Sequence, residues 1–382
     1  MSIYGYYCKM KSFQSGFFRQ INDYKAFFPS IINRKWNFND PSLQHLLSRT
    51  DRSLGRLDAF SDLVDIDVYI MMHKTKEAVL SSKIEGTQTS IEEALMSESA
   101  ISFERKDDWQ EIQNYLNAME RALELSRQLP FSTRLIKALH RPLMSGVRGQ
   151  HKGPGEFRRS QNWIGGTNPS NAIFVPPPQT EIDSLMGDLE KFANDQQNPL
   201  PELLKIAIIH YQFETIHPFQ DGNGRIGRLL ITLFLVEQGI LQQPILYFSD
   251  YLNHNRKEYY DRLMAVRQEN DLTGWLRFFL EGIEKTAREG VQTFRKITQL
   301  QQALPDRLSP LKGRVSNANL VIRALFKNPI ISTAQVSEII GGTHSTAYRL
   351  IKSMITLGIV RPIKSSGRDQ YYVFWEYLDL FR

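Results

Sequence analysis

Apolar residues recur with helical spacing along most of the chain, and strand-like alternation is rare. The pattern from Asp58 to Leu80 predicts one long amphipathic helix, and the Ser90–Glu93 capping box predicts a new helix start at Ser90. Further helical patterns predict two helices within 107–146 and others over 180–195, over 200–215, up to Gly239, and over 256–301. The fold class is therefore predicted to be mainly α.

Two regions depart from this helical pattern. Residues 1 to about 50 are aromatic and mixed in character, and they predict an extended arm that leads into the helices. Residues 148–179 are rich in Gly, Pro and Asn, and they contain one short strand-like run, 171–175, that three prolines end.

The composition changes near residues 305–313, where we place a domain boundary. Beyond it, the patterns predict three helices followed by a short hairpin that turns near Gly367. Three helices and a hairpin in this order are typical of a winged helix-turn-helix domain. The sequence thus predicts three parts: an arm with helices over 1–106, a core over 107–304, and a winged helix domain over 305–382.

The charge of the C-terminal part suggests contact with phosphates. Residues 311–370 contain nine Lys or Arg and two Asp or Glu, which gives +7 (9 − 2), while the whole chain carries +6. Contacts with DNA are predicted for Arg349 and Lys352 on the third helix and for Lys364 and Arg368 in the wing. Dimerisation or recruitment of a target is the alternative role for such a domain.

Composition narrows the class of protein. The 382 residues, 41% of them hydrophobic, are enough for a sizeable core. A single cysteine, Cys8, excludes an internal disulfide framework, and no run reaches about 18 apolar residues. The first residues lack the pattern of a secretory leader. We therefore expect a cytoplasmic protein that does not bind a membrane.

The stretch HPFQDGNGRIGR, residues 217–228, concentrates polar chemistry directly before an apolar helix. Gly222 and Gly224 allow an anion to approach the unpaired N–H groups of a helix start, and Asn223 can donate between them. The guanidinium groups of Arg225 and Arg228 suit phosphate oxygens.

Two further residues of this stretch complete a phosphate-transfer set. Asp221 is a candidate ligand for Mg²⁺, and His217 can accept a proton at neutral pH. The glycines also fit the dinucleotide pattern G-x-G-x-x-G, but that pattern requires a preceding strand, and the preceding segment has helical spacing.

The same stretch matches H-P-F-x-D/E-G-N-G-R-x-x-R, the signature of the Fic family, at every defined position. The chain resembles this family over roughly residues 60–300. The resemblance implies a helical Fic-type core with a short β-hairpin flap. It also implies transfer of AMP from ATP to a hydroxyl side chain of a target protein, with release of pyrophosphate.

The resemblance assigns a role to each residue of the signature. His217 would deprotonate the target hydroxyl, and Asp221 would bind Mg²⁺ between the α- and β-phosphates. The anion hole would comprise Gly222, Asn223 and Gly224. Arg225 would contact the β-phosphate and Arg228 the γ-phosphate.

Three other segments extend the resemblance. The run Ala172, Ile173, Phe174 and Val175 is similar to the flap that aligns the target backbone by strand addition. Tyr259 and Tyr260 are similar to residues near the adenine pocket. Residues 81–86, SSKIEG, match the inhibitory motif [S/T]-x-x-x-E-[G/N], in which Glu85, supported by Ser81, would pair with Arg228 and block the γ-phosphate.

Two classes of function follow. The first is a Mg²⁺-dependent, autoinhibited protein adenylyltransferase that uses ATP and modifies a Ser, Thr or Tyr hydroxyl of a target and of itself. Removal of AMP and transfer of another phosphate-containing group remain alternatives within this class. The second is a DNA-binding regulator in which the Fic core acts as a sensor. The sequence leaves the target and the existence of a homodimer open.

Overall fold

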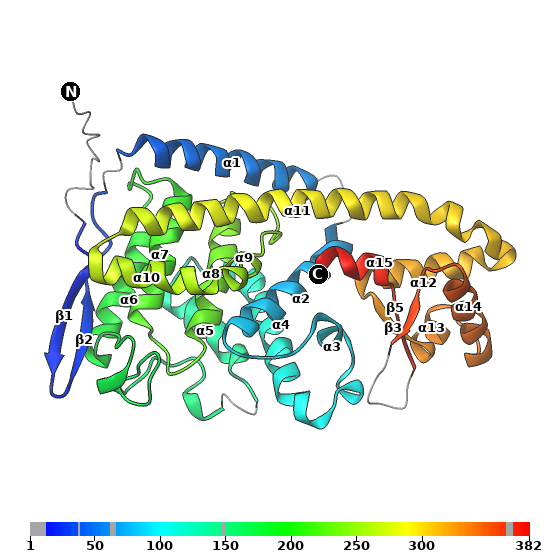
Figure 1. The fold of residues 1–382 in the computed structure, drawn as a ribbon, viewed down its shortest axis with the longest axis horizontal. Helices are drawn as coiled ribbons and strands as arrows, with labels where there is room; N and C mark the ends of the chain where they lie inside the picture. Colours follow the sequence, from blue (N-terminus) through cyan, green and yellow to red (C-terminus); the bar gives the residue numbers. More distant parts are fainter. Residues whose placement is uncertain (1–12, 37–38, 62–65, 147–149, 364–369) are drawn as a thin grey trace.

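The computed structural model describes residues 13–36, 39–61, 66–146, 150–363 and 370–382. The molecule is elongated, with a β-hairpin at one end, a helical body in the middle and a small C-terminal unit at the other end (Figure 1). As the sequence predicts, the described chain is mainly helical. Its helices are α1 (Pro41–Ser61), α2 (Ile66–Ile84), α3 (Ile91–Leu95), α4 (Lys106–Ser126), α5 (Thr133–Leu143), α6 (Ile182–Asn194), α7 (Glu202–Ile216), α8 (Asn223–Glu237), α9 (Ser249–His254), α10 (Arg256–Glu269), α11 (Leu272–Leu308), α12 (Val315–Lys327), α13 (Thr333–Ile339), α14 (His344–Thr356) and α15 (Trp375–Leu378).

The N-terminal segment is not the expected extended arm. Strands β1 (Gly16–Ile21) and β2 (Tyr24–Pro29) form an antiparallel hairpin, in which Ile21 pairs with Tyr24 around a tight turn. Asn22 in this turn has φ 50°, a left-handed conformation that Asn tolerates better than most residues. The prediction missed the hairpin because its turn is Asn-Asp rather than the stronger Asn-Gly signal.

The predicted single helix from Asp58 to Leu80 is also wrong. Its residues belong to two helices, α1 and α2, and residues 62–65 between them lie outside the described part. Helix α1 runs beside the long helix α11 (Figure 1). Contact is close because Gly290 of α11 has no Cβ, which would lie 2.8 Å from a methyl of Leu57. Helical spacing persists through both helices, so it does not mark where the chain changes direction.

The core is built around α7 and α8. Helix α7 is buried from Leu203 to Ile216, and most of α8 is buried as well. Gly227 lets the two helices approach, since a Cβ there would overlap a carboxylate oxygen of Glu214. A helix that is apolar on all sides requires such enclosure. The loop between these two helices, residues 217–222, is therefore held at both ends by the core.

The predicted flap run has little regular strand structure. One isolated antiparallel bridge joins Ile164 to Phe174, and the prolines after Val175 end it. The hairpin lies beside it, because the backbone N–H of Phe27 in β2 donates to the carbonyl of Val175 at 2.9 Å.

The C-terminal unit contains the three predicted helices in the predicted order, together with a strand, β3 (Ile330–Ser332), that was not predicted. Helices α12, α13 and α14 accompany strands β3, β4 (Arg361–Ile363) and β5 (Tyr371–Val373), which form an antiparallel sheet in the order β3-β5-β4. Ser332 caps α13 through a capping box with Gln335. The expected turn near Gly367 lies outside the described residues.

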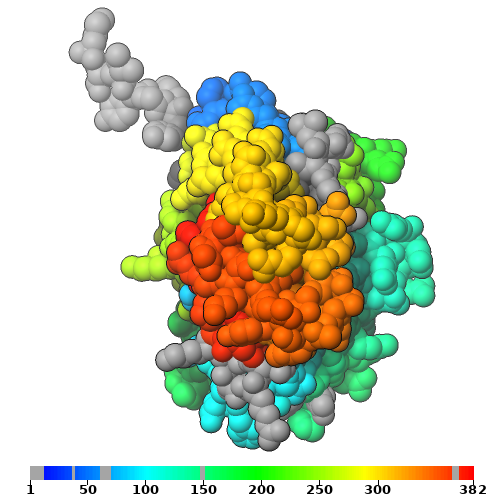
Figure 2. Space-filling model, turned by 90° about the vertical axis from the view of Figure 1, so that its right-hand side faces the viewer, coloured from blue at the N-terminus to red at the C-terminus, as the bar shows by residue number. Residues whose placement is uncertain are grey.

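No flexible linker separates this unit from the body. Helix α11 continues through Pro305, where the sequence predicts a boundary, to Leu308, and the short helix η6 (Ser309–Arg314) leads into α12. The unit forms one end of the molecule, and in this view it lies below the end of α11 (Figure 2). Among the described helices, none has the length and apolar character needed to cross a membrane.

Candidate functional site

His217 stands at the point where α7 ends and the polar loop begins. Its backbone is left-handed, with φ 50° and ψ 59°. This conformation is uncommon for a residue with a side chain. Its carbonyl oxygen accepts hydrogen bonds from Arg158 Nε at 3.0 Å and from Asn162 Nδ2 at 3.4 Å, which hold the turn.

The imidazole of His217 is uncharged at neutral pH. Burial lowers its pKa to about 4, helped by the positive charge of Arg267 and opposed by the negative charge of Glu85. Its Nδ1 is buried and has no hydrogen-bond partner among the described residues. At neutral pH the ring is therefore uncharged, as a general base requires.

The loop after His217 is braced from inside. The side chain of Asn223 accepts from the N–H of Phe219 and donates to its carbonyl, both at 2.8 Å. These two bonds use Oδ1 and one of the two Nδ2 hydrogens, so the role of Asn223 as a donor to an anion stays a prediction. Asn223 also has a backbone N–H at the first position of α8.

His140 of α5 supports the same loop, and sequence reasoning assigned it no role. Its ring stacks on Phe219 with centroids 3.8 Å apart. Its Nδ1 accepts from the N–H of Gly155 at 2.9 Å, so Nε2 carries the hydrogen and donates to the carbonyl of Asp221 at 3.0 Å. No spacing or motif distinguishes this histidine in the sequence.

The start of α8 has a geometry that suits an anion. Gly222 precedes it with φ 77° and lies so close to Met144 that a Cβ would be 2.7 Å from the sulfur. The first N–H groups of a helix lack acceptors within it and carry the positive end of its dipole. A Cβ on Gly224 would overlap Glu85 Oε1, so the carboxylate of Glu85 lies directly against this helix start.

Glu85 also binds Arg228. Arg228 Nη2 lies 2.7 Å from Glu85 Oε1, and the guanidinium, only 1% exposed, donates from Nε to Ser81 Oγ at 2.8 Å. Burial opposes ionisation of Glu85, but the charge and hydrogen bond of Arg228 outweigh it and lower the Glu85 pKa. The structure thus brings together the three residues that the sequence places in the inhibitory contact.

Arg225 is held more loosely than Arg228. Its Nη1 lies 3.5 Å from Glu111 Oε2 of α4, and its Nη2 lies 3.7 Å from Asp221 Oδ1. Its buried Nε has no partner among the described residues. A guanidinium with an unsatisfied donor is ready to bind an anion. Glu111 is a second neighbour that sequence reasoning missed.

Asp221 fits a role as a Mg²⁺ ligand. Its Oδ1 accepts from the N–H of Gly222 at 2.6 Å, and its side chain is 48% exposed. It borders a cavity of about 260 Å³ that Glu85 and Arg225 also line. In the described part of the chain no group of three His, Cys, Asp or Glu residues forms a metal centre.

Comparison with known families identifies this region. Residues 130–235 match the model of the Fic/DOC family, and residues 44–124 match the model of its N-terminal region. The part of the chain that matches the Fic/DOC model, residues 130–235, is called the Fic domain below. The polar loop and most of α8 lie within it.

Known relatives of this Fic domain carry an activity in their names. The chain is similar to a protein adenylyltransferase Fic from Aedes aegypti, with 30% identity over 256 residues that are 64% of this chain and 48% of the relative. A protein of the same name from Drosophila grimshawi is 32% identical over 173 residues, 45% of this chain and 32% of the relative. The chain thus spans half or less of the length of these relatives.

Solved structures show the same fold. A Fic family protein from Desulfovibrio desulfuricans G20 has a TM-score of 0.58 at 20% identity, covering 89% of this chain and 98% of its own. A Fic domain containing signaling protein from Bacteroides thetaiotaomicron VPI-5482 has a TM-score of 0.50 at 18% identity. The match covers 66% of this chain and 96% of that protein.

Two arginines that sequence reasoning missed contact the predicted flap region, and one of them also binds the polar loop. Arg158 Nη2 donates to the carbonyl of Pro177 at 2.6 Å while its Nε binds the carbonyl of His217. The guanidinium of Arg267 in α10 lies 3.9 Å from the centre of the Phe174 ring. Of the predicted flap residues, Phe174 and Val175 are buried, Ala172 is partly buried, and Ile173 is 71% exposed.

The two tyrosines assigned to the adenine pocket differ in exposure. Tyr259 is fully buried, and its hydroxyl lies 2.9 Å from His210 Nε2. This position suits a supporting role in the core. Tyr260 is 38% exposed, and the charges of Glu85 and Arg228 act on its pKa, which burial raises. Tyr260 is therefore the better placed of the two for contact with a nucleotide.

Two predicted DNA contacts lie far from the Fic domain in the chain. Arg349 and Lys352 are exposed on α14. Lys364 and Arg368 lie outside the described residues.

Proposed function

We propose that the protein transfers AMP from ATP to a Ser, Thr or Tyr hydroxyl of a target protein, and of itself, in a Mg²⁺-dependent reaction that Glu85 restrains. One observation carries the proposal: an uncharged His217 lies beside a helix start and two arginines that suit a polyphosphate. The names of the relatives, protein adenylyltransferase, support it.

The residues divide the reaction between them. His217 removes the hydroxyl proton as the hydroxyl oxygen attacks the α-phosphorus of ATP. The bond between the α-phosphorus and the bridging oxygen breaks, and pyrophosphate leaves. Arg225 and the N–H groups at the start of α8 stabilise the charge on the phosphates, and Arg228 binds the γ-phosphate. Mg²⁺ bound at Asp221 would neutralise part of that charge.

The position of Glu85 supports the proposed restraint. Its carboxylate lies against Gly224 and binds Arg228, so a γ-phosphate would meet both steric overlap and negative charge. The proposed enzyme is therefore in a restrained state.

The position of the label in ATP tests the reaction type. The Glu85→Gly variant should attach label from the α-phosphate, but not from the γ-phosphate, to protein, with release of pyrophosphate. Attachment of γ-label would show phosphoryl transfer instead. Release of AMP from a previously modified protein by the wild type would favour removal of AMP as its function.

A second candidate function is DNA binding by the C-terminal unit. It is favoured by the exposed Arg349 and Lys352 on one helix and by the +7 balance of residues 311–370 (9 − 2). Binding of the full chain to random duplex should weaken with salt and should fall in an Arg349→Ala/Lys352→Ala variant. No binding at low salt would exclude this function.

A further inference from the structure

The segment that carries Ser81 and Glu85 is attached to the C-terminal unit on both sides of the inhibitory motif. Before the motif, the ring of His73 in α2 meets the ring of Phe381 edge to face, with centroids 4.9 Å apart. Phe381 belongs to the last short helix, η7 (Asp379–Phe381), and is only 1% exposed.

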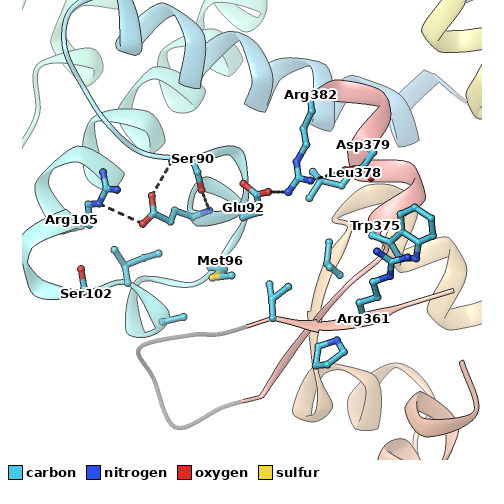
Figure 3. Close-up of a pocket in the computed structure, with 16 residues that line it drawn as sticks. Ser90, Glu92, Met96, Ser102, Arg105, Arg361, Trp375, Leu378, Asp379 and Arg382 are labelled. Carbon is cyan, nitrogen blue, oxygen red and sulfur yellow. Dashed lines mark hydrogen bonds and ion pairs between the residues drawn. The ribbon is translucent and has the colours of Figure 1, made fainter. Parts of the chain in front are cut away.

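After the motif, three polar contacts join α3 and the following residues to the same unit. Asn328 Nδ2 donates to the carbonyl of Leu95 at 3.0 Å. The hydroxyls of Ser97 and Tyr371 lie 2.8 Å apart. Arg382 forms an ion pair with Glu92 (Figure 3). The partners on the C-terminal side come from the end of α12, from β5 and from the chain end.

The junction after the motif is not tightly packed. A cavity of about 540 Å³ separates the two sides, with Met96 and Arg105 on one side and Arg361, Trp375 and Leu378 on the other (Figure 3). This cavity is open to solvent and is not part of a packed core. After the motif, the C-terminal unit therefore holds the segment through a few discrete contacts around the cavity, and such contacts can open without unfolding a core.

Helix α4 holds the same segment from another side. Gln113 Nε2 donates to the carbonyl of Ala94 at 3.0 Å, and Trp109 Nε1 donates to that of Met96 at 3.2 Å. Loss of the C-terminal contacts would therefore loosen the segment rather than release it completely.

We propose that the C-terminal unit acts as a clamp that holds Glu85 on Arg228, so that movement of this unit relieves the inhibition of the Fic site. This inference rests on the proposed function. Any partner that shifts the C-terminal unit would thereby change the access of ATP to Arg228, at a distance from the nucleotide site.

Three conservative variants open the clamp while sparing the fold. Asn328→Asp removes the donor to Leu95 but keeps the Oδ1 acceptor that binds the N–H of Ile330. Tyr371→Phe removes only the hydroxyl, and Arg382→Gln removes the charge. Each net hydrogen bond lost should shift the balance between held and released segment by roughly two- to tenfold.

The experiment uses the full chain with the three substitutions combined. Arg121→Gln, which breaks an exposed ion pair with Glu124 on α4, is the matched control. The rate of labelled AMP incorporation and the hydrogen exchange of backbone amides in residues 83–97 are measured for each. The same substitutions are then repeated in the Glu85→Gly background.

The clamp predicts faster exchange over 83–97 and a several-fold higher rate in the triple variant, with no further gain once Glu85 is absent. An unchanged rate and exchange, beside an active Glu85→Gly variant, would overturn the clamp and leave the proposed function intact. An equal gain in the Glu85→Gly background would also overturn it, because the substitutions would then act elsewhere. If every variant failed to transfer AMP, the proposed function would fail, and the exchange over 83–97 would decide the clamp alone.

Discussion

Glu85 and Arg228 are 143 positions apart in the chain, yet their charged groups meet at 2.7 Å. Glu85 directly follows the last residue of α2, and Arg228 lies in the first turns of α8. The pair joins the N-terminal helices to the start of α8. Under the proposed function, it would close that start to a triphosphate.

Removal of this carboxylate should activate the protein. The Glu85→Gly variant should incorporate labelled AMP faster than the wild type, because Arg228 becomes available to the γ-phosphate. A hydrogen bond between charged groups is worth about 1.5–3 kcal/mol. Glu85 is 37% exposed, so we expect the lower part of this range, about a tenfold gain.

A double variant checks that the gain acts through Arg228. Arg228→Ala loses the phosphate contact together with the inhibitory one, so Glu85→Gly should add nothing in that background. The exposed Glu104→Gly is a control in the same part of the chain and should match the wild type. An unchanged rate for folded Glu85→Gly at saturating ATP would show that Glu85 does not inhibit.

Loss of His217 should remove catalysis but not nucleotide binding. His217→Ala, made in the Glu85→Gly background, should transfer AMP about 10²- to 10⁴-fold more slowly, as expected for loss of a positioned base. ATP affinity, measured by calorimetry, should change little. A transfer rate equal to that of the parent would exclude His217 as the base.

The pH profile of the Glu85→Gly variant should follow the lowered pKa of His217. The free ring stays neutral down to a pKa of about 4, so the rate should not fall between pH 8 and pH 6 through protonation of this base. The negative charge of Glu85 raises the pKa of His217. Loss of Glu85 should therefore lower this pKa further, so that the ring stays neutral to a lower pH. A rate that halves near pH 6.5, the ordinary pKa of histidine, would contradict the buried environment.

Asp221 should determine the response to Mg²⁺. In Asp221→Ala, made in the Glu85→Gly background, titration with Mg²⁺ should no longer raise the rate as it does in the parent. Asp107→Ala tests a carboxylate that lines the same cavity and should leave the response in place. If Asp221→Ala retained the parental Mg²⁺ dependence, another group would hold the metal.

Buried neutral histidines should make the fold sensitive to acid. Burial lowers the pKa of His73 and His210 to about 3 and that of His140 to about 4. Below pH 6.5 the unfolded chain binds protons that the native protein excludes, so the free energy of unfolding falls as pH falls toward these values. At pH 5 the loss is on the order of 2 kcal/mol for each excluded proton.

Urea unfolding at pH 7.5 and pH 5 measures this loss. A His73→Phe variant should lose less stability over the same interval, because one titrating group is gone while its ring contacts with Tyr247 and Phe381 are kept. Equal losses in variant and wild type would mean that His73 is not kept neutral.

Local patterns in the sequence determined most helices and the chemistry of the loop. Helical spacing located α4 to α8, and a capping box located the start of α3 at Ser90, because both signals depend on neighbours within one or two turns. The signature 217–228 placed the base, the anion site and both arginines together, since the whole set lies on one turn and one helix start.

Only the tertiary structure decided which distant groups meet these residues. His140, Arg158 and Arg267 support the loop and flap through contacts that depend on the packing of other elements, and each is an ordinary polar residue in its own segment. The side chain of Asn223 serves the loop because folding places the Phe219 backbone within its reach. The attachment of the inhibitory segment to the C-terminal unit likewise joins residues far apart in the chain, and no local pattern encodes such a distance.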